Sequence, residues 1–397
     1  MEWPDDFWWG TGASSTQCEG ASPASDWWAW ELAGRVPPSG DGNGFATRYA
    51  EDFAALASLG LTHHRLSIDW SRIEPVEGER DPAAVEHYRR VLDAAHAAGI
   101  TPWVCLHHFV LPQWIADRGG FLDPTTRTEH WARHVDFIAA TYGDLVSGWQ
   151  PVNEMNLYPT LAYRLAAIPP FHTDADEWAR ATEEVQLATA EAAVRLKATG
   201  APVASIFGLL AVTATDDDPA TRDAVDQLLH SNEGIGLDLF RDGVLRVPTR
   251  EPIERPDLAG AFDLIGFSYY VSVGFRAGAM VSYPDDAPSS PLGYSIWADG
   301  LGQVLRRLHD RVPNTPLLVA EYGIGTDDDA ERAAYLQRGL EVVQEALAEG
   351  VDVRGLFHWT AVDNYEWSHG YDVRFGIIDR DRTVRPSAQV LAREARA

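Results

Sequence analysis

Cysteine and lysine are the scarcest reactive residues of this 397-residue chain. There are two cysteines, Cys18 and Cys105, and one lysine, Lys197. Two cysteines cannot form a disulfide framework or a four-thiolate zinc site, so we interpret both as small buried hydrophobes. A Schiff-base aldolase or a Walker-type nucleotide-binding protein needs a lysine inside a particular motif, whereas Lys197 stands near the end of a predicted helix. The composition therefore argues against both classes.

Positive charge and long apolar runs are also lacking. The chain has 32 Lys and Arg against 59 Asp and Glu, a formal net charge of −27. Such a surface repels phosphate backbones and anionic lipids, so we expect no nucleic-acid partner and no membrane. No stretch reaches the roughly 18 apolar residues of a membrane span, and residues 1–12 lack the cationic start of a signal peptide. We therefore expect a cytoplasmic protein.

Short apolar runs alternate with amphipathic segments along the whole chain, which is the pattern of an α/β protein. Amphipathic helices are predicted between the strands, and several end in the glycine expected just past a helix. The candidate strands are residues 7–14, 61–68, 101–108, 146–153, 202–209, 262–269, 316–323 and 353–360. Eight strand–helix units predict a single (β/α)8 TIM barrel over residues 1–397, with its active site at the C-terminal ends of the strands.

Two glutamates follow or end apolar runs where a solvated side chain is not expected. Glu154 comes directly after the fourth predicted strand and Glu321 lies near the end of the seventh. Most glutamates are surface residues, so their positions set these two apart. Two carboxyl groups reaching into one barrel mouth suit general acid–base work coupled to nucleophilic attack, as in the cleavage of a glycosidic bond.

Other polar residues occur at the ends of the same strands. Arg65 on the second strand is a candidate for holding one carboxylate ionised, and Tyr270 could hydrogen-bond that carboxylate. An ion pair that closes the barrel end is an equally good interpretation of Arg65.

The chain contains 15 tryptophans, more than a core of this size normally requires. The flat C–H faces of sugars stack on indole rings, so the excess favours a carbohydrate ligand. Trp359 and Trp367 lie at and just after the eighth predicted strand, with Glu366 adjacent, whereas the tryptophans of residues 8–30 are better explained by packing.

Paired histidines raise the alternative of a metal-dependent hydrolase. Adjacent residues on a strand point to opposite faces, so His107 and His108 can supply only one ligand to a common site. Spacings that place two ligands on one side are absent. We therefore predict no metal and no other cofactor, and expect one member of this pair to hydrogen-bond substrate.

Seven segments, in order, resemble glycoside hydrolase family 1, the β-glucosidase and β-galactosidase family. The likeness runs through almost the whole chain, and the seven together are specific where one alone is weak. They are FWWGTGASSTQCEG, HRLSIDWSRIEP, LHHFVLPQW, QPVNEMN, GFSYYVS, VAEYGIG and HWTAVDNYEWSHGYDVRFGIIDRD.

The resemblance implies a (β/α)8 barrel and a retaining double-displacement mechanism. It makes Glu154 the acid/base and Glu321 the nucleophile, with Asn153 on the sugar 2-hydroxyl and Tyr270 and Arg65 around the nucleophile. Retention implies carboxyl groups ~5–5.5 Å apart. The residues that it implies for the remaining sugar contacts are Gln17, His108, Glu366, Trp367 and Trp359.

The implied substrate is a small β-glycoside or oligosaccharide with a terminal glucosyl, galactosyl or fucosyl unit. Glu366 and the lack of lysine in residues 354–382 argue against 6-phosphosugars, because a dianion would meet a carboxylate. The chain departs from the family pattern at Met155, Ala320, Tyr322, Ser268 and Phe109.

Three alternatives remain open from the sequence. The same site could favour transglycosylation, the chain could be a sugar-binding relative that has lost catalysis, or a metal hydrolase could be built on the histidines. The leaving-group preference and the oligomeric state are not set by the sequence.

Overall fold

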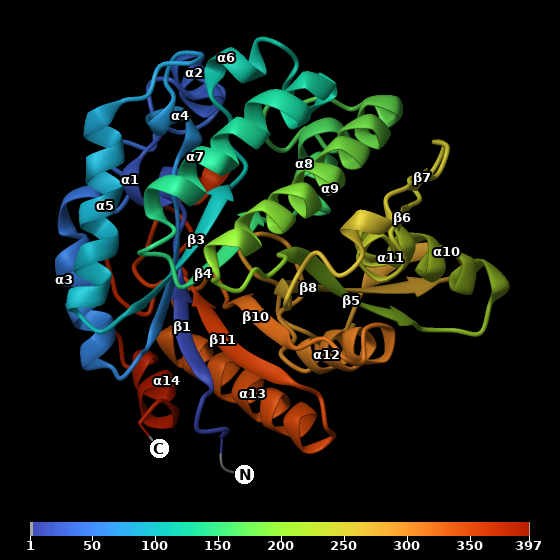
Figure 1. Cartoon of the computed structure of the whole chain (residues 1–397). Helices are drawn as coiled ribbons and strands as arrows, with labels where there is room; N and C mark the ends of the chain where they lie inside the picture. Colours follow the sequence, from blue (N-terminus) through green and yellow to red (C-terminus); the bar gives the residue numbers. More distant parts are fainter. Residues whose placement is uncertain (1–2, 397) are drawn as a thin grey trace.

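Eight parallel strands form the closed centre of the computed structural model, which describes residues 3–396 (Figure 1). The first strand pairs in parallel with both the second and the last, so the two ends of the chain meet in the sheet. These strands are β1 (Trp8–Gly12), β2 (His63–Ser67), β3 (Thr101–His107), β4 (Gly148–Val152), β5 (Phe207–Ala214), β8 (Ile265–Arg276), β10 (Leu317–Tyr322) and β11 (Val353–Trp359). The predicted α/β barrel is confirmed.

The barrel closes between β4 and β8 by a different route from the one predicted. The fifth strand is predicted at 202–209, but regular pairing of β5 starts only at Phe207. Before that residue, isolated bridges at Val203 and Ala204 close the sheet. Between them the Ser205 hydroxyl accepts from the Gly266 N–H at 3.1 Å and lies 3.2 Å from its carbonyl. A side chain thus replaces the backbone ladder at this point.

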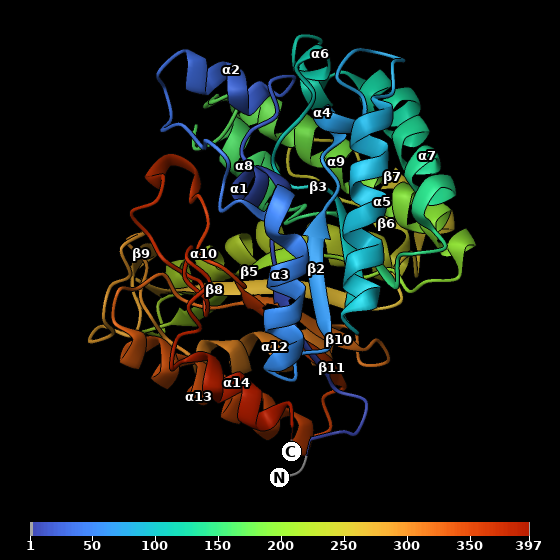
Figure 2. The ribbon, with the colours of Figure 1, turned by 90° about the vertical axis from the view of Figure 1, so that its left-hand side faces the viewer.

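Helices surround the strands, and each barrel strand is followed by one that returns the chain (Figures 1 and 2). Aspartates start several of them: Asp81 accepts a hydrogen bond from the Ala83 N–H, and Asp328 accepts one from the Ala330 N–H. The returning helices are α3 (Phe45–Ser58), α5 (Pro82–Ala97), α7 (Ala132–Tyr142), α9 (Ala175–Leu196), α11 (Ile235–Asp242), α12 (Gly300–Arg311), α13 (Asp329–Ala348) and α14 (Ala388–Glu394).

Further helices and strands lie in the connections. They are α1 (Ser15–Glu19), α2 (Asp26–Leu32), α4 (Trp70–Ile73), α6 (Gln113–Ala116), α8 (Leu157–Tyr163), α10 (Pro219–Leu229), β6 (Val244–Leu245), β7 (Ile253–Glu254) and β9 (Ala279–Ser282). β9 pairs antiparallel with the far end of β8, which explains why that strand extends beyond the predicted residue 269. Among residues 3–396, no helix has the length and apolarity needed to cross a membrane.

Apolar side chains fill both faces of the sheet, as a covered parallel sheet requires. The main cluster packs the outer face against the helices, and Cys18 belongs to it. A second, smaller cluster consists of Trp103, Ala204, Ile206, Leu264, Leu318, Ala320 and Phe357. The polar residues that the sequence predicts to act together lie beyond this second cluster, at the C-terminal ends of the strands.

Candidate active site

A cavity of about 300 Å³ lies at the C-terminal ends of the strands. Nine of the ten predicted site residues line it, and the tenth, Arg65, is fully buried directly beneath two of them. The nine are Gln17, His108, Asn153, Glu154, Tyr270, Glu321, Trp359, Glu366 and Trp367. Residues up to 350 positions apart in sequence are thus brought to one place by barrel closure.

Glu321 is held by hydrogen-bond donors on both carboxylate oxygens. Arg65 Nη2 forms a buried ion pair with Oε1, and the Tyr270 hydroxyl donates to Oε2 at 2.6 Å. Burial raises the pKa of the Tyr270 phenol far above its usual range, so it remains a donor. The strand also shifts register beside Glu321 against β8, and such irregularities re-aim a side chain. Both carboxylate oxygens of Glu321 are thus held in a fixed position by the neighbouring strands.

Glu154 lies in the same cavity with fewer donors. The Ser268 hydroxyl on β8 donates to its Oε1, and a side chain added at Gly208 would come within 3.0 Å of its carboxyl carbon. Burial, reinforced by the negative charge of Glu321, raises the pKa of Glu154 to about 8, while Ser268 and Arg65 oppose the shift. The surroundings therefore favour a protonated Glu154 at neutral pH.

Three of the eight described non-glycine residues with positive φ line this cavity. Glu154 has a φ of 46°, Phe109 of 68° and Trp367 of 45°, all in the left-handed region that residues other than glycine rarely adopt. All three residues line the cavity. Strain of this kind persists where the surrounding structure fixes a side chain for function.

A chain of polar contacts surrounds the two carboxyl groups. Arg65 Nη1 donates to Asn153 Oδ1 at 3.1 Å, and Asn153 Nδ2 lies 3.3 Å from His108 Nε2. Burial and the Arg65 charge hold the pKa of His108 well below its usual range, so the imidazole is neutral. With Nε2 accepting from Asn153, the proton stands on Nδ1, which has no partner among the described residues and is free for a ligand hydroxyl.

Gln17 and Glu366 form a second polar pair from opposite ends of the chain. Gln17 Nε2 donates to Glu366 Oε2 at 3.1 Å, and the Ser14 hydroxyl orients the Gln17 carbonyl at 2.7 Å. Burial, with the charges of Glu321 and Glu154, raises the pKa of Glu366 to about 8. The pair presents two hydrogen-bonding side chains to the cavity in a fixed orientation.

Aromatic rings complete the enclosure. The His108 ring stacks on Trp359 at 5.7 Å and on Trp367 at 6.1 Å between centroids, and Arg65 lies 5.3 Å from the Trp359 ring. Gly12 lets the Trp359 indole approach β1, since a Cβ there would lie 2.9 Å from it. His107 faces away and packs on Tyr158, as expected for its neighbour on a strand.

Sequence reasoning did not identify two parts of the site. Ser268 was noticed only as a departure from the family pattern, although its bond to Glu154 places it in the site. The remaining wall is apolar or aromatic, and such residues cannot be told from core residues in a sequence. It consists of Phe109, Leu157, Leu161, Val271, Leu292, Tyr294 and Phe375.

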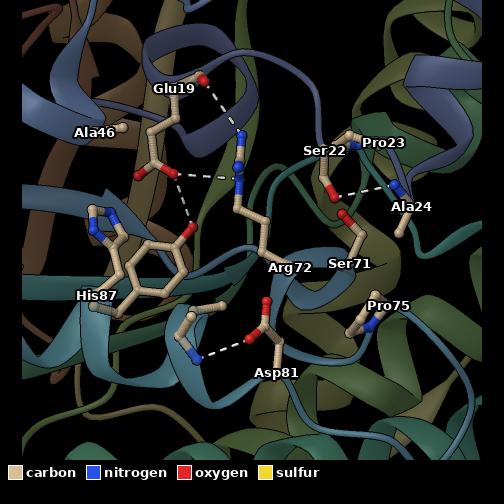
Figure 3. A pocket seen from close by; sticks show the side chains of 13 residues that line it. Glu19, Ser22, Pro23, Ala24, Ala46, Ser71, Arg72, Pro75, Asp81 and His87 are labelled. Atoms are coloured by element: carbon tan, nitrogen blue, oxygen red, sulfur yellow. Dashed lines mark hydrogen bonds and ion pairs between the residues drawn. The ribbon is translucent and has the colours of Figure 1, made fainter.

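A second hollow, of about 450 Å³, lies between α1, α4 and α5 (Figure 3). Its charged groups satisfy one another: Glu19 Oε2 lies 3.5 Å from Arg72 Nε and accepts from the Tyr88 hydroxyl at 3.0 Å. Asp81 caps α5 through the Ala83 N–H. The carboxyl groups of this hollow thus have structural partners. Among residues 3–396 no cluster of three His, Cys, Asp or Glu side chains is placed to hold a metal ion.

Comparisons with known proteins agree with this geometry. A family model described as glycosyl hydrolase family 1 matches residues 1–397. The chain is 31% identical to thermostable β-glucosidase B of Thermobispora bispora, over 97% of this chain and 87% of that protein. It is 28% identical to a cyanidin 3-O-glucoside 7-O-glucosyltransferase (acyl-glucose) of Delphinium grandiflorum, covering 98% and 89%. A β-glycosidase structure from Pyrococcus horikoshii superposes with a TM-score of 0.90 at 28% identity, covering 100% and 95%.

Proposed function

Because this chain belongs to glycosyl hydrolase family 1 and is a β-glycoside hydrolase, we propose that it acts by a retaining double displacement in which Glu321 is the nucleophile and Glu154 the acid/base. The observation that carries the proposal is that both carboxyl groups line one cavity in contrasting surroundings. Donors surround Glu321, whereas burial favours the protonated form of Glu154. This is the division of labour that the mechanism requires.

In the first step a Glu321 oxygen attacks the anomeric carbon and the bond to the leaving oxygen breaks. Glu154 gives its proton to that oxygen, so an alcohol departs and a glycosyl ester of Glu321 remains. In the second step Glu154, now ionised, removes a proton from water, which attacks the same carbon and releases Glu321. Two inversions give net retention.

Six side chains bind the sugar unit in this proposal. Asn153, fixed by Arg65, meets the 2-hydroxyl, where hydrogen bonds strengthen in the transition state. Gln17, His108, Glu366 and Trp367 hold the outer hydroxyls, and the Trp359 indole is the floor beneath the ring. The substrate is a terminal, unphosphorylated β-glucosyl, β-galactosyl or β-fucosyl unit, because no Lys or Arg among the described side chains that line the cavity is available to bind a phosphate.

The test is hydrolysis of aryl β-glycosides that differ at C4 and C6, together with labelling by a 2-fluorosugar inactivator. We expect turnover of at least one glycoside, with the label on Glu321. Sugar binding with no turnover of any of them would support the catalytically impaired alternative instead.

Transfer to an alcohol is a second candidate activity of the same site. The relative described as a glucosyltransferase supports it, since the glycosyl ester of Glu321 can be attacked by an alcohol as well as by water. Product analysis with added alcohols separates the two: new glycosides at the expense of free sugar indicate transfer.

A further inference from the structure

Two chemically different sets of side chains line the cavity. Every acidic side chain of the lining is a glutamate of the proposed sugar-binding and catalytic set. Outside that set, the lining offers one phenol, Tyr294, and otherwise only apolar side chains. The two sets suit different parts of a substrate.

The apolar wall begins beside the proton donor. A Cβ added at Gly208 would lie 3.0 Å from the Glu154 carboxyl carbon and 3.1 Å from Leu157 Cδ2, so Leu157 and the carboxyl group flank one point. The leaving oxygen must meet Glu154, and the first atoms of the leaving group therefore meet Leu157. The position of the acid thus identifies the leaving-group side.

The same wall continues outward along α8. Leu161 follows Leu157 at a spacing of four, on the same helix face, and also lines the cavity. Both leucines are half-buried. Val271 follows Tyr270 on β8 and lines the same cavity. The three side chains give the cavity an apolar wall that an apolar ligand could cover.

From this arrangement we infer that the enzyme prefers β-glycosides of apolar alcohols or phenols to oligosaccharides, an inference that rests on the proposed function. An apolar leaving group would bury its surface against Leu157, Leu161 and Val271. A sugar in the same place would bring several hydroxyl groups to a wall with almost no hydrogen-bonding partners, and burying a hydroxyl without a partner is costly.

The experiment compares kcat/KM for methyl, propyl and hexyl β-glucosides and for cellobiose, or for the matching galactosides or fucosides if those turn over faster. The three alcohols are leaving groups of nearly equal acidity. Differences in kcat/KM among their glucosides therefore reflect contacts with the apolar wall and not the ease of bond cleavage. We expect a rise of about twofold to fourfold per methylene, and hexyl glucoside to exceed cellobiose.

Leu161→Asn tests the wall itself. It lies a helical turn beyond Leu157 and is half-buried, so we expect the variant to fold and to lower the hexyl-to-methyl ratio by about tenfold. Val194→Asn is the matched control. Val194 is 45% exposed on α9, away from the cavity, so the hexyl-to-methyl ratio of this variant should equal that of the wild type. If Leu161→Asn fails to fold, the wild-type series decides.

A hexyl-to-methyl ratio of one or less, or cellobiose as the better substrate, overturns the inference while leaving the proposed function intact. Absence of turnover on every glycoside, including a dinitrophenyl one, overturns the proposed function and this inference with it.

Discussion

The surroundings of Glu321 and Glu154 differ although both carboxyl groups line one cavity. Glu321 has a buried guanidinium and a phenol on its two oxygens. Glu154 has one hydroxyl donor, a glycine and apolar neighbours, and burial raises its pKa to about 8. The difference teaches that two identical side chains acquire distinct surroundings from what the neighbouring strands present to them, and these surroundings suit the separate roles that we propose.

Removing the first carboxylate is expected to have the largest effect. Glu321→Ala should reduce kcat/KM to below about one ten-thousandth, because no oxygen is left to attack the anomeric carbon. Added azide should restore part of the activity and yield a glycosyl azide of inverted configuration, detected by NMR. A variant that keeps a tenth of the wild-type rate would contradict the assignment.

Removing the second carboxyl group should distinguish substrates by their leaving groups. Glu154→Ala should lower kcat/KM for alkyl glycosides by about 10²- to 10⁴-fold, since these leaving groups need a proton. Dinitrophenyl glycosides need none, and their burst phase should remain near the wild-type rate. Equal losses of activity on alkyl and dinitrophenyl glycosides would contradict the acid role that distinguishes Glu154 from Glu321. Circular dichroism establishes that each variant is folded.

The buried ion pair at Glu321 should be visible in stability as well. Arg65→Gln leaves a buried carboxylate without its cation and should lower the free energy of unfolding by roughly 3–5 kcal/mol, measured in urea. Arg48→Gln, which breaks the exposed pair with Glu51, should change it by less than about 1 kcal/mol. Combining Arg65→Gln with Glu321→Gln should recover much of the loss; simple additivity would show that the two side chains are not coupled.

The smallest expected effect concerns the pH profile. The acid role needs protonated Glu154, so kcat/KM should fall as pH rises through about 8. Ser268 and Arg65 lower this pKa, whereas Glu321 raises it. Ser268→Ala removes a donor to the ionised form and should move the alkaline limb upward by about one pH unit. Ser268→Thr keeps the hydroxyl and should show the alkaline limb of the wild-type pH profile. If the alkaline limb does not move in Ser268→Ala, the hydrogen bond does not act on the pKa of Glu154.

The polar half of the site was predictable because strand ends in a barrel converge. Glu154, Glu321 and Tyr270 stand out in the sequence as polar residues that interrupt or end apolar runs, and the resemblance supplied their order. The apolar half was not predictable, because Leu157 and Leu161 have the spacing of any amphipathic helix and nothing local tells a cavity wall from a core contact.

The fold shows the same division. Strands bounded by clear turn residues lie within a few positions of their predicted bounds. The fifth strand was misplaced, because residues 202–209 have the local pattern of a strand throughout. The contact of Ser205 with Gly266 depends on a partner 61 residues away, and the tail of β8 pairs with β9 residues up to 9 positions away. Pairing of this kind overrides local preference.

The hydrogen bond between Gln17 and Glu366 has a consequence for biosynthesis. Its two partners are separated by 366 − 17 = 349 positions, which a ribosome translates in about 17–70 s at roughly 5–20 residues per second. During that interval the β1 edge that will receive β11 has no strand to pair with. The nascent chain must keep this edge from associating with other chains, and sugar recognition begins only when nearly all of the polypeptide has emerged.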